Sequence, residues 1–227
     1  MASMAPWVPQ YASPASLLPD MLDRFKQFWQ GVVLAPFVTL FLRLGISPDA
    51  VTLVGTLGVA AGALVCFPLG LLWQGVLVIT CFVFGDLIDG QMARVSGRTS
   101  RFGAFWDSTL DRIGDGAVFG GLVLYFAGPG DDYLYLCVAL WCLVMGSVTS
   151  YARARAESLG MDARGGLAER ADRLVSILVL TFFGDLLGLP VLYEATLWVL
   201  AVASTYTVAF RVLKVRRQAA AAGTGAE

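Results

Sequence analysis

Long segments without charged residues alternate along the chain with short segments that hold most of its charge. The longest one covers positions 50–85, 36 residues without Asp, Glu, Lys or Arg, and Pro68 and Gly70 within it favour a turn. Because about 20 apolar residues form a helix that crosses the hydrocarbon core of a bilayer, this segment predicts two membrane helices. The other apolar segments predict four more. We therefore expect an all-α membrane protein with six transmembrane helices, at 48–69, 71–95, 102–127, 132–158, 168–187 and 191–216.

The two ends of the chain differ in pattern from these segments. Positions 21–45 combine charged residues with an apolar stretch that Pro36 interrupts, which favours an amphipathic helix lying along the membrane surface. Positions 1–20 are rich in proline and 218–227 are small or polar, so we expect both ends to be flexible. The predicted domain is the six-helix unit at 46–217.

The positive charges fall on one side of this arrangement. All 16 Lys and Arg residues lie at or near the side that holds both termini, and the turns around Gly70, Gly128 and Leu189 contain none. Cytoplasmic segments of membrane proteins carry the excess of Lys and Arg. We therefore expect a multi-pass membrane protein, with the loops at 94–103 and 159–170 and both termini in the cytoplasm.

The composition excludes several classes of function. Hydrophobic residues make up 57% of the chain, charged residues 15%, and the mean hydropathy is +0.71, which excludes a disordered protein and differs strongly from a soluble domain. The net charge of −1 predicts no nucleic-acid partner, and the absence of histidine excludes an imidazole base. The four cysteines lie in apolar segments without paired spacing, so we read them as small buried residues.

Five aspartates are concentrated within thirty residues, Asp86, Asp89, Asp107, Asp111 and Asp115. The first two are three apart and the next pair four apart, so each pair shares one face of a helix. A short loop makes the two helices antiparallel neighbours, which brings four carboxylates together near the cytoplasmic membrane boundary. Clustered carboxylates in a membrane suit Mg²⁺, or Mn²⁺, and two ions are the simplest interpretation. Metal-assisted displacement at phosphorus is the reaction class that this arrangement favours.

These residues carry a family resemblance. The sequence Asp86-x-x-Asp89-Gly90-x-x-Ala93-Arg94, followed after eight residues by Gly103-x-x-x-Asp107-x-x-x-Asp111, resembles the signature of the CDP-alcohol phosphotransferases without departure. The resemblance implies a six-helix, usually dimeric enzyme in which a CDP-linked lipid alcohol donates its phosphatidyl group and CMP leaves. It also implies that the four aspartates bind the metal ions and that Asp111 is the base.

The resemblance also implies contacts to the CDP-lipid. Positions 47–52 open the first predicted span, where members of the family place cytidine contacts, although Ser47 and Pro48 also fit a helix cap. The residues expected to bind the CDP-lipid are Asp49, Thr52, Gly90, Ala93, Arg94, Ser100 and Gly103.

The second half of the chain should select the acceptor. Its arginines look like those of bacterial phosphatidylinositol-phosphate synthases of the actinobacterial type, which implies 1L-myo-inositol 1-phosphate as acceptor. Arginines from three helices without a carboxylate partner each would grip a dianionic phosphate, and the alternative is that they only mark the cytoplasmic side. Arg155 and Arg170 also fit salt bridges to Glu157 and Glu169. The residues expected to bind the acceptor phosphate are Ser150, Arg153, Arg173 and Arg211.

Three further questions stay open at this point. The main rival within the enzyme class is phosphatidylglycerol-phosphate synthase, with glycerol 3-phosphate as acceptor, and the rival from another class is a divalent-cation transporter. Glycines in the first and third spans predict close helix packing, either within one chain or at a homodimer interface. The expected partners are CDP-diacylglycerol, inositol 1-phosphate, membrane lipids and a second copy of the chain.

Overall fold

The computed structural model describes residues 39–40, 44–45, 47–95 and 100–223, and the side chains of the second long helix only as far as Val83. The membrane-surface helix expected at 21–45 lies almost entirely outside these residues. Within them the protein is all-helical, and six long helical segments lie near the predicted positions. Their bounds are α3 Pro48–Ala61, continued by a π-helical turn Gly62–Cys66 and a 3₁₀ turn Phe67–Leu69, then α4 Leu72–Val95, α5 Arg101–Ala127, α6 Tyr133–Ser158, α7 Arg170–Leu186 and α8 Val191–Gly223.

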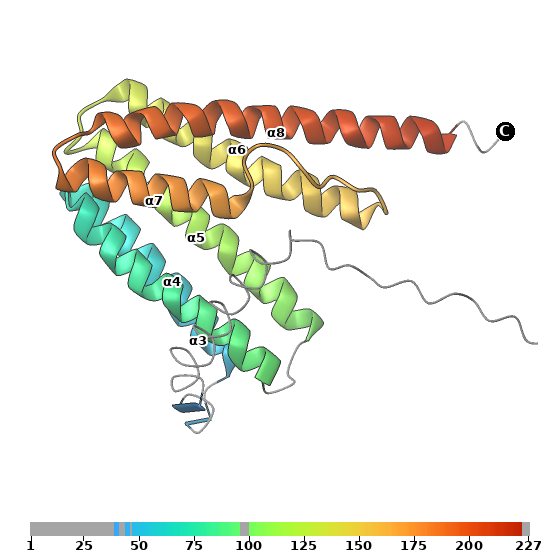
Figure 1. Ribbon diagram of the computed structural model, residues 1–227, viewed down its shortest axis with the longest axis horizontal. Coiled ribbons are helices and arrows are strands. Elements are labelled where there is room, and N and C mark those ends of the chain that lie inside the picture. The colour runs from blue at the N-terminus through green and yellow to red at the C-terminus, as the bar shows by residue number, and fades with distance from the viewer. Residues whose placement is uncertain (1–38, 41–43, 46, 96–99, 224–227) are drawn as a thin grey trace, which may run out of the picture.

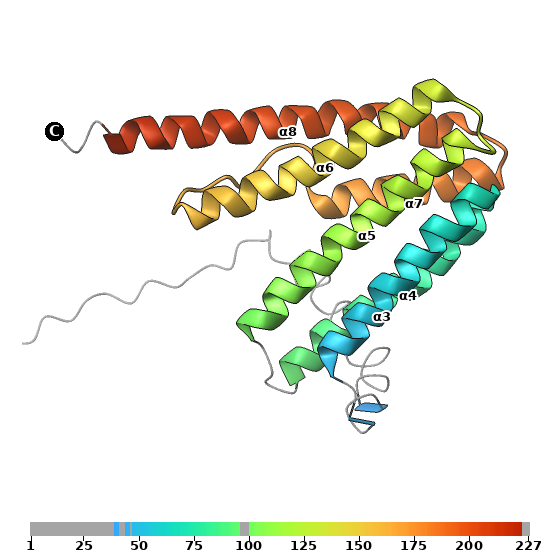
Figure 2. The same cartoon turned by 180° about the vertical axis from the view of Figure 1, so that it is seen from behind.

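The helices form two groups that α5 joins. α3 packs on α4 and α5, α6 packs on α5 and α8, and α7 packs on α4 and α8. The groups α3–α5 and α6–α8 meet at one end and diverge toward the other in both views (Figures 1 and 2). Side chains from all six segments build the core in the half where they meet, including Phe67, Leu72, Leu122, Ile177 and Leu197.

Polar side chains begin several of the helices. Ser47 accepts a hydrogen bond from the amide of Ala50 at 3.3 Å, which confirms the cap expected before Pro48. Ser100 accepts one from the amide of Gly103 at 2.8 Å at the start of α5, and Asp132 accepts from two amides at the start of α6. Capping side chains therefore mark the starts of α3, α5 and α6, near the helix boundaries that the sequence predicted.

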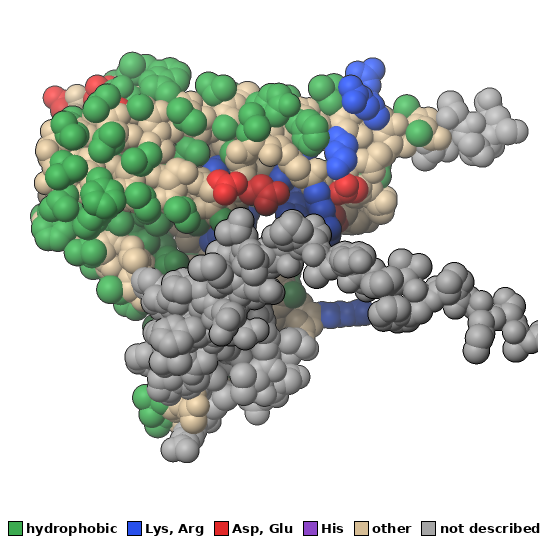
Figure 3. All heavy atoms as spheres, viewed as in Figure 1, with side chains coloured by type: hydrophobic (Ala, Val, Ile, Leu, Met, Phe, Trp, Pro, Cys, Tyr) green, Lys and Arg blue, Asp and Glu red, His purple; other side chains and the backbone are tan. Residues whose placement is uncertain are grey.

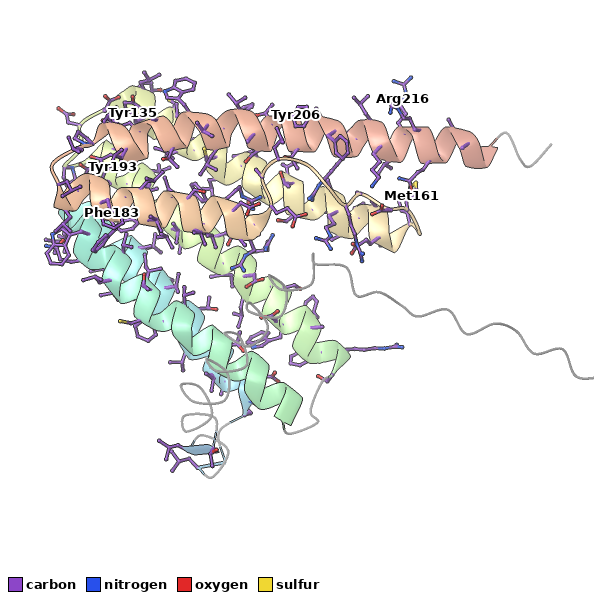
Figure 4. The ribbon with its side chains drawn as sticks, viewed as in Figure 1. Tyr135, Met161, Phe183, Tyr193, Tyr206 and Arg216 are labelled. Atoms are coloured by element: carbon purple, nitrogen blue, oxygen red, sulfur yellow. The ribbon has the colours of Figure 1, made fainter. Side chains whose placement is uncertain are left out.

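Direct contacts bring the turns without positive charge together. Trp73 at the start of α4 donates its amide hydrogen to Asp185 of α7 at 2.9 Å, and the Tyr125 and Tyr193 hydroxyls lie 3.4 Å apart. Figure 4 places Tyr193 at this end and Arg216 toward the opposite end of the protein. Among the side chains coloured in Figure 3, Lys and Arg are absent from this end of the visible face.

The close helix packing predicted from the glycines occurs within one chain, which is one of the two alternatives that the sequence left open. A Cβ added at Gly121 of α5 would lie 2.5 Å from the carbonyl oxygen of Ala63, and one added at Gly58 of α3 would meet the Phe82 ring. These glycines let α3 approach α4 and α5 more closely than any side chain would allow.

Helix length bears on the predicted membrane spans. Among the described residues, three helical segments, Pro48–Leu69, Tyr133–Ser158 and Val191–Ala221, are long and apolar enough to cross a membrane, and the count of six spans stays a prediction. α8 continues to Gly223, past position 217 where we expected the ordered domain to end. Four consecutive alanines at 219–222 explain this, since alanine has the highest helix propensity.

Candidate active site

Carboxylates of the signature lie on one face of α5. Asp107 and Asp111 are one helical turn apart, and Asp107 is exposed whereas the Asp111 side chain is 21% exposed. Their expected partners Asp86 and Asp89 lie within α4. The structure describes only the backbone there, for these two residues as for Ala93 and Arg94. α4 and α5 run in opposite directions, as the sequence predicted, and the convergence of the four carboxylates stays a prediction.

The oxygen donors that are described fit a hard divalent cation. The side chains of Asp107 and Asp111 are accessible on the same helix face, with no sulfur or nitrogen ligand in the signature. Carboxylate oxygens of this kind suit Mg²⁺ or Mn²⁺. In the part of the chain whose side chains are described, no group of three such ligands occurs, and two of the four predicted ligands belong to that part.

The first residues of α3 and α5 meet beside this face. Trp106 donates its indole N–H to the carbonyl oxygen of Asp49 at 3.2 Å, and a Cβ added at Gly103 would lie 3.6 Å from the Asp49 carboxylate. Thr52 is buried and donates to the carbonyl oxygen of Pro48 at 3.1 Å. Four residues predicted to bind the CDP-lipid, from two distant positions in the sequence, therefore begin neighbouring helices: Asp49, Thr52, Ser100 and Gly103.

One turn further along α5, Asp115 joins three arginines. Its carboxylate accepts a hydrogen bond from Arg170 Nε at 2.9 Å, and lies 3.6 Å from Arg173 Nη2 and 3.8 Å from Arg112 Nη2. Arg170 also reaches Asp111, with Nη2 3.0 Å from its carboxylate oxygen. The Arg173 side chain is 2% exposed and the Arg170 side chain is 35% exposed, so this ion-pair network between α5 and α7 extends from a buried arginine to partly accessible ones.

Backbone carbonyl groups hold the guanidinium group of Arg211. Its Nη1 donates to the carbonyl oxygen of Thr149 at 2.6 Å and its Nε to that of Gly165 at 3.2 Å. Arg173 in turn donates to the carbonyl oxygen of Ala168 at 3.0 Å. The loop 159–169 thus fixes two arginines of different helices.

Two expectations about arginine partners were wrong. Arg153 pairs with Glu157 at 3.0 Å on its own helix and Arg173 pairs with Asp115, so both have a carboxylate partner. Arg170 pairs with Asp111 and Asp115 instead of Glu169, and Glu157 pairs with Arg153 and Arg164 instead of Arg155. The physical reason is the direction of the helices, which aims Arg170 at α5 across the bundle.

Ser150 joins the same network from α6. It accepts a hydrogen bond from Arg112 and donates one to the carbonyl oxygen of Gly146 at 3.2 Å. Sequence reasoning did not assign Arg112 or Asp115 to the acceptor site. The signal that could have found Asp115 was the four-residue spacing from Asp107 through Asp111 to Asp115, which continues the signature face by one turn.

The loop between α6 and α7 also contacts the end of α8. Lys214 donates to the Asp162 carboxylate at 2.8 Å, and Gln218 donates to the Asp162 carbonyl oxygen at 2.6 Å. The hydrogen bond from Lys214, followed by one from the amide of Arg164, lowers the pKa of Asp162 below its ordinary value. These contacts place the loop against α8, beside Arg211.

A family and several relatives resemble the chain over most of its length. The sequence pattern of CDP-alcohol phosphatidyltransferases matches residues 45–209. The phosphatidylinositol phosphate synthase of Streptomyces avermitilis is 50% identical over 208 residues, covering 89% of this chain and 85% of that protein. The synthase of the same name from Cutibacterium acnes is 46% identical, covering 87% of this chain and 98% of that protein.

Solved structures agree with the fold. The crystal structure of Mycobacterium tuberculosis phosphatidylinositol phosphate synthase with CDP-DAG bound has a TM-score of 0.77 and 42% identity, and the match covers 81% of this chain and 93% of that one. The same enzyme in complex with manganese and citrate matches with the same TM-score, over 81% of this chain and 88% of that one. The signature on α4 and α5, the extent of the family match and these relatives lead to one conclusion: this chain belongs to the CDP-alcohol phosphatidyltransferase family.

Proposed function

We propose that this protein transfers the phosphatidyl group of CDP-diacylglycerol to a hydroxyl of 1L-myo-inositol 1-phosphate, with CMP as the leaving group. The observation that carries the proposal is the pair of buried arginines, Arg173 and Arg211, of which Arg173 shares the Asp115 carboxylate with Arg170, the partner of Asp111. Guanidinium groups bind phosphate through two parallel hydrogen bonds, which suits an acceptor that already carries a phosphate. The names of the relatives support the same acceptor.

In the proposed reaction, Asp111 removes the proton from the attacking hydroxyl. The acceptor oxygen forms a bond to the phosphorus that bears diacylglycerol, and the bond from that phosphorus to the CMP oxygen breaks, so CMP leaves with the electron pair. Asp111 is suited to this because it is partly accessible and pairs with Arg170, which shares the Asp115 carboxylate with the predicted acceptor residue Arg173.

Asp86, Asp89, Asp107 and Asp111 would hold Mg²⁺ or Mn²⁺, two ions in the simplest arrangement. Bound divalent ions supply charge stabilisation at the pyrophosphate and the leaving CMP. Asp49, Thr52, Ser100 and Gly103 would bind the CDP-lipid together with Gly90, Ala93 and Arg94. The related Mycobacterium tuberculosis synthase has been solved with CDP-DAG bound, which supports this donor.

The proposal includes a membrane arrangement. All six helical segments at 46–217 would cross a bacterial cell membrane, with the helix at 21–45 along its surface and the chain ends at 1–20 and 218–227 in the cytoplasm. The distribution of Lys and Arg supports this orientation. A homodimer in contact with membrane lipids completes the proposal.

Product identification tests the acceptor. Purified protein with CDP-diacylglycerol and Mg²⁺ is offered inositol 1-phosphate, glycerol 3-phosphate or free inositol in separate reactions, and lipid products and CMP are measured. We expect CMP and phosphatidylinositol phosphate only with inositol 1-phosphate. Preference for glycerol 3-phosphate would identify the phosphatidylglycerol-phosphate rival, and preference for free inositol would overturn the role of the arginines.

A further inference from the structure

Asp115 is the point where guanidinium groups of two helices meet. Its two carboxylate oxygens have different partners: Oδ1 accepts from Arg170, and Oδ2 lies near Arg173 and Arg112. The Asp115 side chain is 14% exposed and that of Arg173 is 2% exposed, so solvent screens their attraction only weakly. The family signature ends at Asp111 and assigns no role to Asp115.

Three neighbouring guanidinium groups repel one another, and an anion among them offsets this repulsion. Within the described residues, Asp115 contacts all three, whereas Asp111 lies within ion-pair distance of two. Removing the partner of a buried charge is strongly unfavourable, so the arginines would move apart or toward solvent without it. The Asp115 carboxylate therefore fixes where the α7 arginines lie relative to α5.

Position along α5 decides which role Asp115 can have. A four-residue step advances about 6 Å along a helix, so Asp115 lies one turn beyond Asp111 toward the hydrophobic core. The cavity beside it, lined also by Cys142, Gly146 and Ser147, measures about 10 Å³, room for one water molecule. An inositol phosphate cannot enter this cavity, so Asp115 supports the arginines from the side that faces the hydrophobic core.

The same network reaches the other predicted acceptor residue. Arg112, which faces Asp115, donates a hydrogen bond to Ser150 of α6. Gly146, one turn before Ser150, lies beside Arg173, since a Cβ there would make an ordinary contact with Arg173 Nε at 3.4 Å. The Asp115 carboxylate on α5 is thus connected to groups of α6 and α7 that we predict to bind the acceptor.

We propose that Asp115 is a positioning residue that holds Arg170 and Arg173 in register with Asp111, so that the acceptor phosphate is bound where its hydroxyl can reach the base. The inference rests on the proposed function, since it assigns a role in binding the phosphorylated acceptor. It predicts an effect on the acceptor and none on the donor or the metal ions.

The test compares Asp115→Asn with a matched control, Asp172→Asn. Both changes remove one negative charge, but Asp172 is exposed on the first turn of α7, beside Arg173 in sequence. For Asp115→Asn we expect KM for inositol 1-phosphate to rise about 10-fold or more, the usual cost of losing a supporting group. Inhibition by inorganic phosphate should weaken by a similar factor. KM for CDP-diacylglycerol and the Kd for Mn²⁺, measured by electron paramagnetic resonance on the purified protein, should stay within about 2-fold.

A second variant separates positioning from folding. Asp115→Glu keeps the charge and should recover part of the acceptor affinity, and Asp172→Asn should match the unmodified protein. Unchanged KM for inositol 1-phosphate in Asp115→Asn, or equal losses of donor, metal and acceptor affinity in Asp115→Glu, would overturn the inference. If the unmodified protein does not use inositol 1-phosphate, the proposed function fails instead, and the two failures are thereby distinguished.

Discussion

The carboxylate face of α5 and the arginines of α6–α8 are held in place by different means. Asp107 and Asp111 are related by one turn of one helix, so local geometry fixes their relative position. Arg173 and Arg211 depend on partners far away in the sequence, Asp115 in α5 for the first and the carbonyl oxygens of Thr149 and Gly165 for the second. The comparison indicates that the relative position of the α5 carboxylates rests on helix periodicity, and that the placement of the arginines rests on tertiary packing.

The largest expected effect is at the carboxylate face. Asp107→Asn keeps the shape of the side chain and removes a negative charge that a divalent ion requires, so we expect turnover to fall at least about 100-fold with the fold intact. Turnover with saturating substrates and Mn²⁺ affinity measure it. Asp131→Asn, in the turn at the opposite end, is the control, since asparagine also tolerates its positive φ of 42°. Full activity of Asp107→Asn would contradict the metal assignment.

The second prediction compares substitution of the buried Arg173 with substitution of the exposed Arg153. Arg173→Gln leaves Asp115 without its buried arginine partner, so we expect KM for inositol 1-phosphate to rise about 10- to 100-fold and the protein to lose about 3 kcal/mol of stability. Arg153→Gln breaks a pair with Glu157 in which the Arg153 side chain is 41% exposed, so its stability loss should stay below about 1 kcal/mol.

Steady-state kinetics for both substrates, together with thermal unfolding, measure these two variants. KM for CDP-diacylglycerol should remain nearly constant in both. Equal stability losses in Arg173→Gln and Arg153→Gln would show that burial does not distinguish the two arginines.

A third prediction concerns the loop that fixes these arginines. Gly166 has φ +125°, and a Cβ there would lie 2.4 Å from Thr207 Cγ2, while the Thr207 hydroxyl accepts hydrogen bonds from the amides of Leu167 and Ala168. Gly166→Ala should therefore lower stability by about 2 kcal/mol or more, from backbone strain and the clash together. Gly160→Ala has φ +74° and open space around it, so it should cost only the strain, about 1 kcal/mol.

Thermal unfolding of both glycine variants measures this difference. We expect Gly166→Ala also to raise KM for the acceptor, because the loop carries the carbonyl groups bound by Arg173 and Arg211. A larger loss in Gly160→Ala than in Gly166→Ala would contradict the contact with Thr207.

The smallest expected effect depends on pH. The hydrogen bond from Lys214 lowers the pKa of Asp162 in the folded protein, so the carboxylate binds its proton less readily than in the unfolded chain. Its contribution to stability is then fully present above the unfolded pKa of about 4 and is lost as the pH falls through the lower folded value. Asp162→Asn removes the carboxylate, so the variant should be slightly less stable than the unmodified protein at pH 7, and this difference should vanish as the pH falls below about 4, as unfolding measured across this range would show. A pH profile identical to that of the unmodified protein would contradict it.

Much of the candidate site followed from the sequence because its relations are local. The spacing of Asp107 and Asp111 fixed their common face, and Ser47 before Pro48 fixed the start of α3. The charge-free segments located the helices to within a few residues, except for the end of α8, where alanines extend the helix. The signature also identified the family before any contact was known.

The partners of the arginines were decided only by the tertiary structure. Arg153 pairs with Glu157, four residues away, which is a local pair that the sequence permitted. Arg170, in contrast, pairs with Asp111 and Asp115 and not with its sequence neighbour Glu169. Helix periodicity determines which residues share a face of one helix. The packing of α7 on α4 and α8 determines that Arg170 meets the Asp111 and Asp115 carboxylates of α5, and no spacing within either helix encodes that arrangement.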